Sequence, residues 1–208
     1  MKKQSIEFFL DELSSNKLVP GGGSAASLVG AVGISLGSMV GNLALGKKKY
    51  NSIRSEIESV IDKSEKLKLE FEVLIEKDAQ SCDPLAKAFK LPTSTPEEIS
   101  HKEKVMETAL EQACTVPLEI MKKTIEAIEL HDQLSKLGIR TAISDIGVGV
   151  AFCKAALEGA SLSIFINTKL MKNDGNSSKL NDEAERLLQT GKQKANAIFN
   201  EVAAWLKS

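Results

Sequence analysis

The stretch that most constrains the fold runs from Gly21 to Gly46 and contains no charged side chain. It opens with three glycines, and Ser24 is predicted to be the N-cap of a helix that continues to about residue 46. Gly33, Gly37 and Gly41 stand four apart, so they are expected to share one face of that helix. Because glycine has no side chain, another backbone or a flat ligand can approach this face closely.

Three interpretations of this run fit the sequence. The first is a transmembrane helix, since about 18 uncharged residues suffice to span a bilayer and small residues four apart are typical of membrane helix packing. The second is a fully buried helix in a soluble bundle. The third adds a binding site, because a glycine turn and a helix N-terminus offer free N–H groups to a polar ligand. The high glycine and serine content favours the second and third interpretations over a helix that faces lipid.

Length and composition predict the rest of the architecture. The chain has 208 residues, and 42% of them are hydrophobic, which is enough for one core. Aromatic residues make up only 4%, so the core is expected to be aliphatic and rich in alanine. We predict an all-α fold, a bundle of about six helices around a buried glycine-rich central helix. Residues 1–208 are predicted to form a single domain.

Charge and cysteine usage exclude several classes of function. The formal net charge of -1 disfavours a nucleic-acid-binding protein, which usually carries a basic face. Cys82, Cys114 and Cys153 are scattered without metal-ligand spacing, and the two histidines also lack suitable neighbours, so no metal site is expected. The N-terminus lacks the apolar core of a signal peptide. We therefore expect a cytoplasmic protein without a membrane or nucleic-acid partner.

An acidic residue on an apolar stripe is the most informative feature outside the glycine run. Between residues 53 and 75, apolar side chains recur at helical spacing, and Asp78 continues the stripe three residues after Ile75. A carboxylate that faces a core needs partners to offset its desolvation, and its pKa is usually perturbed. The pattern leaves a structural role and a catalytic role both open.

Two further polar segments are candidates for a site. Asp145 is the only charged residue between Arg140 and Lys154, and it follows Ser144 where a helix is predicted to begin. Helix capping and a role in a site both fit this pair. Residues 47–49 are all lysine and follow the central helix. They either complement the helix dipole or form a cationic patch for an anionic ligand.

Several short motifs, taken together, resemble a known family. The segments 20–24 and 46–50 resemble the cyclodeaminase family, which includes the C-terminal domain of formiminotransferase-cyclodeaminase and stand-alone bacterial cyclodeaminase and cyclohydrolase proteins. Further matching positions, in chain order, are residues 77–80, 90–92, 95–98, 144–145 and Asn167. The resemblance covers nearly the whole chain without large gaps. Each motif alone is weak, and the set is moderately specific.

The resemblance implies an all-helical, homodimeric folate enzyme with the folate at or near the dimer interface. The implied reaction is deamination of 5-formimidoyltetrahydrofolate to 5,10-methenyltetrahydrofolate and ammonia. The alternative reaction is hydrolysis of 5,10-methenyltetrahydrofolate by a methenyltetrahydrofolate cyclohydrolase. Neither requires a cofactor beyond the tetrahydrofolate substrate, which can carry a polyglutamate tail. Any formiminotransferase partner would be a separate protein.

The resemblance also implies which residues form the site. Asp78 is the first choice for the catalytic acid or base, and Asp145 is the second. The residues expected to bind substrate are Gly21, Gly22, Gly23, Ser24, Lys47, Lys48, Lys49, Ser144 and Asn167. The lysines would contact the glutamate carboxylates of the folate.

The chain departs from the family pattern at two positions. Thr93 stands where the family often has a lysine after Leu-Pro, and Ser163 replaces the first of two asparagines that stand four residues apart. These changes leave open a further alternative for the function, namely an inactive folate-binding or structural helical dimer.

Overall fold

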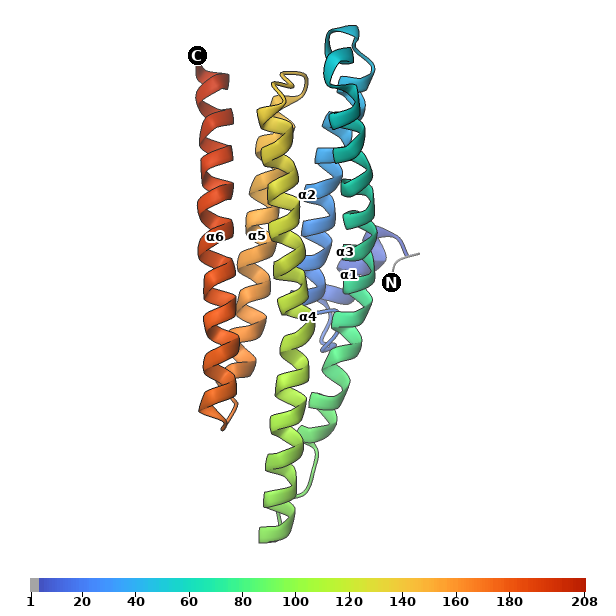
Figure 1. The fold of residues 1–208 in the computed structure, drawn as a ribbon. Coiled ribbons are helices and arrows are strands. Elements are labelled where there is room, and N and C mark those ends of the chain that lie inside the picture. The colour runs from blue at the N-terminus through green and yellow to red at the C-terminus, as the bar shows by residue number, and fades with distance from the viewer. Residues whose placement is uncertain (1–3) are drawn as a thin grey trace.

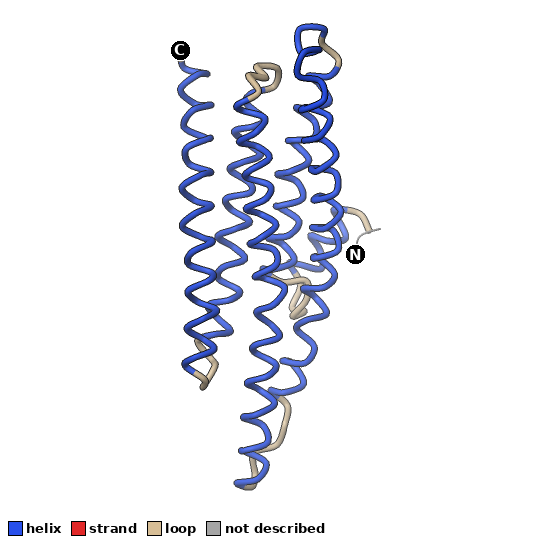
Figure 2. The backbone as a smooth tube through the Cα atoms, in the orientation of Figure 1, coloured by secondary structure: helices blue, strands red, loops and turns tan. Residues whose placement is uncertain are grey.

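The structure is a computed structural model that describes residues 4–208, and within that range short loops join helices and no strand occurs (Figures 1 and 2). Six α-helices and one short 3-10 helix follow one another without a strand, which confirms the predicted all-α bundle. Their bounds are α1 Ile6–Ser14, α2 Gly22–Leu45, η1 Lys48–Ile53, α3 Arg54–Phe89, α4 Pro96–Lys136, α5 Ile143–Thr168 and α6 Asp174–Lys207.

The five long helices lie side by side (Figure 1). The helix α4 packs against α3, α5 and α6, while α2 packs mainly against α3 and α5. Two contacts show that α2 and α5 are antiparallel, since Gly22 at the start of α2 lies near Ser163 and Gly33 in its middle lies near Gly149. The start of α2 is therefore next to the end of α5.

The glycines of α2 allow close contacts, but on more than one side of the helix. A Cβ added at Gly33 would lie 3.0 Å from the carbonyl oxygen of Gly149, so α2 and α5 touch through their backbones. Gly37 instead faces His131 of α4, and Gly41 faces Ile61 of α3. Residues four apart rotate by about 40° around a helix axis at each step. The three glycines therefore meet three different helices rather than forming one flat face as predicted.

Two helix starts differ from the sequence predictions. The N-cap of α2 is Gly21, not Ser24, which lies inside the first turn and is fully buried. The N-cap of α5 is Ala142, whose φ of 55° is in the left-handed region, so neither Ser144 nor Asp145 caps that helix. At the start of α2 the local preference was overridden because Ser24 binds Asp78, 54 residues away.

The outer sides of α2 and α5 are apolar and exposed. Both helices are long and apolar enough to span a membrane, judged by length and composition alone, and about half of each span is buried in the protein (50% and 44%). The exposed apolar side chains form what we call the α2–α5 face, which consists of Val32, Met39, Leu43, Val148, Phe152, Leu162 and Ile166. The central helix is thus buried on the bundle side and open on the other.

Candidate functional site

The carboxylate of Asp78 is held inside the bundle by the first turn of α2. Only 6% of Asp78 is exposed, as its place on the apolar stripe of α3 predicts. The Ser24 hydroxyl donates to Asp78 Oδ2 at 2.8 Å, and the Ser24 Oγ also lies 3.2 Å from the carbonyl oxygen of Ile75. A residue predicted to cap its own helix therefore binds the candidate catalytic acid of another.

Gly23 makes this arrangement possible. A Cβ at Gly23 would lie 2.1 Å from Asp78 Oδ1, which is far too close for any side chain. The N-cap Gly21 provides no side-chain hydrogen bond to the first turn of α2. The carboxylate of Asp78 lies there instead, where the positive end of the helix dipole favours an anion. Asp78 is therefore both a structural partner of α2 and a candidate for chemistry.

The surroundings of Asp78 change its acidity. Burial raises the pKa of Asp78 above its usual value, and the hydroxyl and backbone N–H of Ser24 oppose that rise because they favour the charged form. A raised pKa brings the carboxyl closer to neutral pH, where it can both accept and return a proton. These are the properties that acid–base catalysis requires.

Two polar residues of α5 lie near the same turn. A Cβ at Gly22 would be 3.9 Å from Ser163 Oγ, and Asn167 Nδ2 donates to the carbonyl oxygen of Ser163 at 2.8 Å. The departure at Ser163 thus lies beside the glycine turn. The residues that the fold gathers here, which we call the Asp78 end, are Gly21, Gly22, Gly23, Ser24, Asp78, Ser163 and Asn167.

An apolar groove of about 490 Å³ begins next to the Asp78 end and continues along α2. Leu28 and Ile75, which line it, stand about one helical turn from Ser24 and Asp78 respectively. Phe9 of α1 lines the groove from its other side. This groove could not be predicted from the sequence, because three separate helices form it. It offers a place for the flat, apolar part of a ligand about one helical turn from Asp78.

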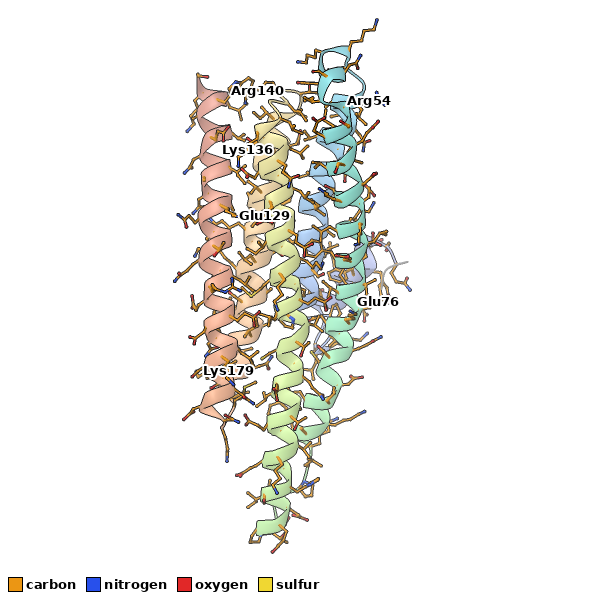
Figure 3. The ribbon with its side chains drawn as sticks, viewed as in Figure 1. Arg54, Glu76, Glu129, Lys136, Arg140 and Lys179 are labelled. Carbon is orange, nitrogen blue, oxygen red and sulfur yellow. The ribbon has the colours of Figure 1, made fainter. Side chains whose placement is uncertain are left out.

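The other predicted site residues lie at the opposite end of α2. We call this group the lysine end, and its members are Lys47, Lys48, Lys49, Tyr50, Arg140, Ser144 and Asp145. Figure 3 shows Arg54 and Arg140 at this end of the bundle, whereas Glu76, two residues before Asp78, lies well along α3. The helix α2 has 24 residues, so about 35 Å separates the two ends. A single chain therefore does not bring Asp78 and Asp145 together.

Tyr50 and Arg140 were not predicted as site residues. The Tyr50 hydroxyl accepts the backbone N–H of Arg140 at 3.0 Å, and Lys49 Nζ lies 4.7 Å from the centre of the Tyr50 ring. The partners are 90 residues apart in sequence, so no local pattern could have revealed the contact.

The loop that carries the Thr93 departure is fixed by a lysine from another position. Lys102 Nζ donates to the carbonyl oxygens of Phe89 and Leu91 at 2.8 and 2.9 Å. Thr93 lines a cavity of about 230 Å³ together with Leu170, which follows α5. The described residues, 4–208, contain no group of three or more His, Cys, Asp or Glu side chains placed to hold a metal ion.

Comparison with known proteins connects this geometry to a family. The sequence model described as Formiminotransferase-cyclodeaminase matches residues 5–186. A Methenyltetrahydrofolate cyclohydrolase from Methylorubrum extorquens is 38% identical over 80% of both chains. A Formimidoyltransferase-cyclodeaminase from Mus musculus is 28% identical over 96% of this chain, which spans 37% of the mouse protein. The crystal structure of formiminotetrahydrofolate cyclodeaminase from Thermotoga maritima is similar in fold, with a TM-score of 0.80, 24% identity and coverage of 97% and 98%.

Proposed function

The chain belongs to the formiminotransferase-cyclodeaminase family, and from that premise we propose that it is a folate one-carbon enzyme. Its reaction takes place at the carbon carried between N5 and N10 of tetrahydrofolate. The observation that carries the proposal is the buried Asp78 carboxyl, which Ser24 and the glycine turn hold beside an apolar groove. This arrangement suits a flat ligand that exchanges a proton at one edge.

The first candidate reaction is hydrolysis of 5,10-methenyltetrahydrofolate to 10-formyltetrahydrofolate. Asp78 accepts a proton as water adds to the amidinium carbon, which becomes tetrahedral. The bond from this carbon to N5 then breaks as the hydroxyl gives up its proton to solvent and becomes the formyl oxygen on N10, and Asp78 returns its proton to N5. The 38% identity to a relative named as a cyclohydrolase, over 80% of both chains, favours this reaction.

The second candidate reaction is deamination of 5-formimidoyltetrahydrofolate. Here N10 attacks the formimidoyl carbon, and holding the two groups together makes the step intramolecular. Asp78 accepts the N10 proton and delivers it to the departing nitrogen, which leaves as ammonia. Similarity to the mouse formimidoyltransferase-cyclodeaminase over 96% of this chain favours this reaction. In both reactions the tetrahydrofolate derivative is the only cofactor-like molecule required.

A homodimer completes this proposal. The α2–α5 face is apolar and exposed, and such faces usually mark interaction sites. A second copy of the chain can cover it, since two-fold symmetric dimers join identical surfaces. If the two-fold axis is perpendicular to α2, the lysine end of one protomer lies opposite the Asp78 end of its partner. The lysines and Asp78 then act on the same folate from different protomers.

The dimer has a direct test. Phe152→Glu places a charge on the α2–α5 face, whereas Leu69→Glu changes an exposed apolar residue on α3, outside that face. We expect the wild-type protein and Leu69→Glu to sediment as dimers at micromolar concentration, and Phe152→Glu as a monomer with little activity. An active wild-type monomer would contradict the shared site.

We also propose that the protein is cytoplasmic. Within residues 4–208 all three cysteines are free, which is typical of a reducing compartment. Cell fractionation tests this, because recovery only with membranes would mean that the two apolar helices contact lipid rather than a second copy.

The reaction is tested by incubating the purified protein separately with 5,10-methenyl- and 5-formimidoyltetrahydrofolate. With 5,10-methenyltetrahydrofolate, loss of the methenyl absorbance faster than the uncatalysed rate identifies a cyclohydrolase. With 5-formimidoyltetrahydrofolate, appearance of the methenyl absorbance together with release of ammonia identifies a cyclodeaminase. Tight binding of both compounds without turnover would instead mean an inactive folate-binding protein, and the catalytic proposal would fail.

A further inference from the structure

The first helix, α1, is held loosely at the side of the bundle (Figure 1). Phe9 is its one buried residue, whereas Ile6 and Leu10 are 75% and 53% exposed. In the part of the chain that the structure describes, every hydrogen bond and ion pair of α1 joins residues within the range 5–17. Residues 15–18, which follow α1, are exposed as well. A helix with so few buried contacts opens at little cost in free energy, so Phe9 is its main anchor.

Phe9 also lines the apolar groove of about 490 Å³ that lies between α1, α2 and α3. Leu28 and Ile75 line it from the other two helices, and Phe9 is the only aromatic side chain among the described residues around it. The volume of the groove is within the usual range for a small-molecule pocket, and such pockets are mostly apolar and aromatic. A loosely held helix therefore forms one wall of the groove near Asp78.

We propose that α1 is a lid on this groove, and that Phe9 is the residue through which the lid closes on a flat aromatic ligand. The ligand lies between the Phe9 ring and the apolar side chains of α2 and α3, since aromatic rings stack favourably on one another. The helix α1 then gains contacts that it lacks in the free protein, so the ligand favours the closed lid. The identification of this ligand as the pterin ring of a tetrahydrofolate derivative rests on the proposed function.

The competing occupant is a second copy of the chain. Val32 and Met39 line the groove and also belong to the α2–α5 face, so a partner on that face reaches the edge of the groove. A small ligand is favoured because the groove is hollow and passes Ile75, about one helical turn from the Asp78 carboxyl. The two occupants differ in one measurable respect, because contact with a second copy strengthens as the protein concentration rises and contact with a ligand does not.

The experiment is amide hydrogen exchange of the whole chain, with and without monoglutamyl tetrahydrofolate. This probe lacks the one-carbon group and is not turned over. Phe9→Leu keeps an apolar anchor for α1 but removes the ring. Phe8→Leu is the matched control, because Phe8 is the next residue, is 40% exposed and does not line the groove.

In the free protein, the amides of α1 should exchange faster than those of α2. Tetrahydrofolate should slow the exchange of α1 in the wild-type protein and in Phe8→Leu. In Phe9→Leu this slowing should be lost, and calorimetry should show about fivefold weaker binding, as expected for one lost aromatic stack. KM should rise by the same factor in Phe9→Leu, with kcat unchanged.

The outcomes separate the lid from the proposed function. Exchange of α1 that bound tetrahydrofolate leaves unchanged, or that slows with protein concentration instead, would overturn the lid even if turnover is normal. Equal affinities of Phe9→Leu and Phe8→Leu would overturn the role of the ring. Binding that protects α1 without turnover of either substrate would refute the enzyme and support the lid. Failure of tetrahydrofolate to bind would overturn both.

Discussion

The contact between Gly23 and Asp78 gives the sharpest prediction about the site. In Gly23→Ala the new methyl group would lie 2.1 Å from Asp78 Oδ1 and 2.6 Å from its Cγ. No Cβ tolerates such distances, so the carboxylate has to rotate away or α2 has to shift. Either movement weakens the hydrogen bond between Ser24 and Asp78, which joins the two helices at this point.

The size of the effect follows from these two losses. Overpacking a well-filled site typically costs about 1–3 kcal/mol, and weakening a hydrogen bond to a charged group adds to that. We expect the free energy of unfolding to fall by about 3 kcal/mol in total. For a chain of this length, this corresponds to a melting temperature about 6–12 °C lower. Turnover should fall as well, because the carboxyl leaves the position in which Ser24 holds it.

Gly22→Ala is the matched control. The nearest atom to a Cβ at Gly22 is Ser163 Oγ at 3.9 Å, which is an ordinary contact. We expect its stability to stay within about 0.5 kcal/mol of wild type. Calorimetric melting of both variants, followed by turnover assays, makes the comparison. If Gly23→Ala were as stable and as active as Gly22→Ala, the close approach of α2 to Asp78 would be wrong.

Three further predictions concern single side chains. In Ser24→Ala, Asp78 loses a group that lowers its pKa, so the limb of the pH–rate profile that reports this carboxyl should move to higher pH. Burial lowers the pKa of His131 to about 4, so the folded protein resists protonation of this side chain. The free energy of unfolding should therefore fall by about 3 kcal/mol as the pH drops from 6.5 toward 4. Urea unfolding at neutral and acid pH should show a smaller acid loss in His131→Leu. Asp145→Asn removes a charge from the first turn of α5, which should lower stability by about 0.3–1 kcal/mol in thermal melts and leave kcat unchanged.

Some features of the fold could be predicted because they depend on residues close in sequence. One such feature is the start of α4 at Thr95, where the sequence predicts a capping box. The structure confirms it, since the Thr95 and Glu98 side chains each accept the backbone N–H of the other residue. The burial of Asp78 also followed from helical spacing, since an acid on an apolar stripe points where the stripe points. In both cases the pattern and the contact lie within a few residues of each other.

Other features could not be predicted, because they depend on the packing of distant segments. Ser24 has the chemistry of an N-cap, but its hydroxyl binds Asp78, 54 residues away. Nothing in the sequence shows that α2 and α5 run antiparallel, so the separation of Asp145 from Asp78 within one chain was not foreseen. The contact of Tyr50 with Arg140 depends on the same topology.

The central claim, that Asp78 carries the proton in a folate one-carbon reaction, is tested most directly by Asp78→Asn. Asparagine keeps an acceptor for Ser24 but cannot exchange the proton, so kcat should fall by on the order of 10²–10⁴, with folate affinity little changed. Because burial raises the pKa of Asp78, ionisation of this carboxyl at higher pH destabilises the folded protein. Asparagine carries no charge, so the variant should melt no lower than wild type at neutral pH. Full turnover of 5,10-methenyl- or 5-formimidoyltetrahydrofolate by Asp78→Asn, with activity lost in Asp145→Asn at unchanged stability, would contradict the assignment.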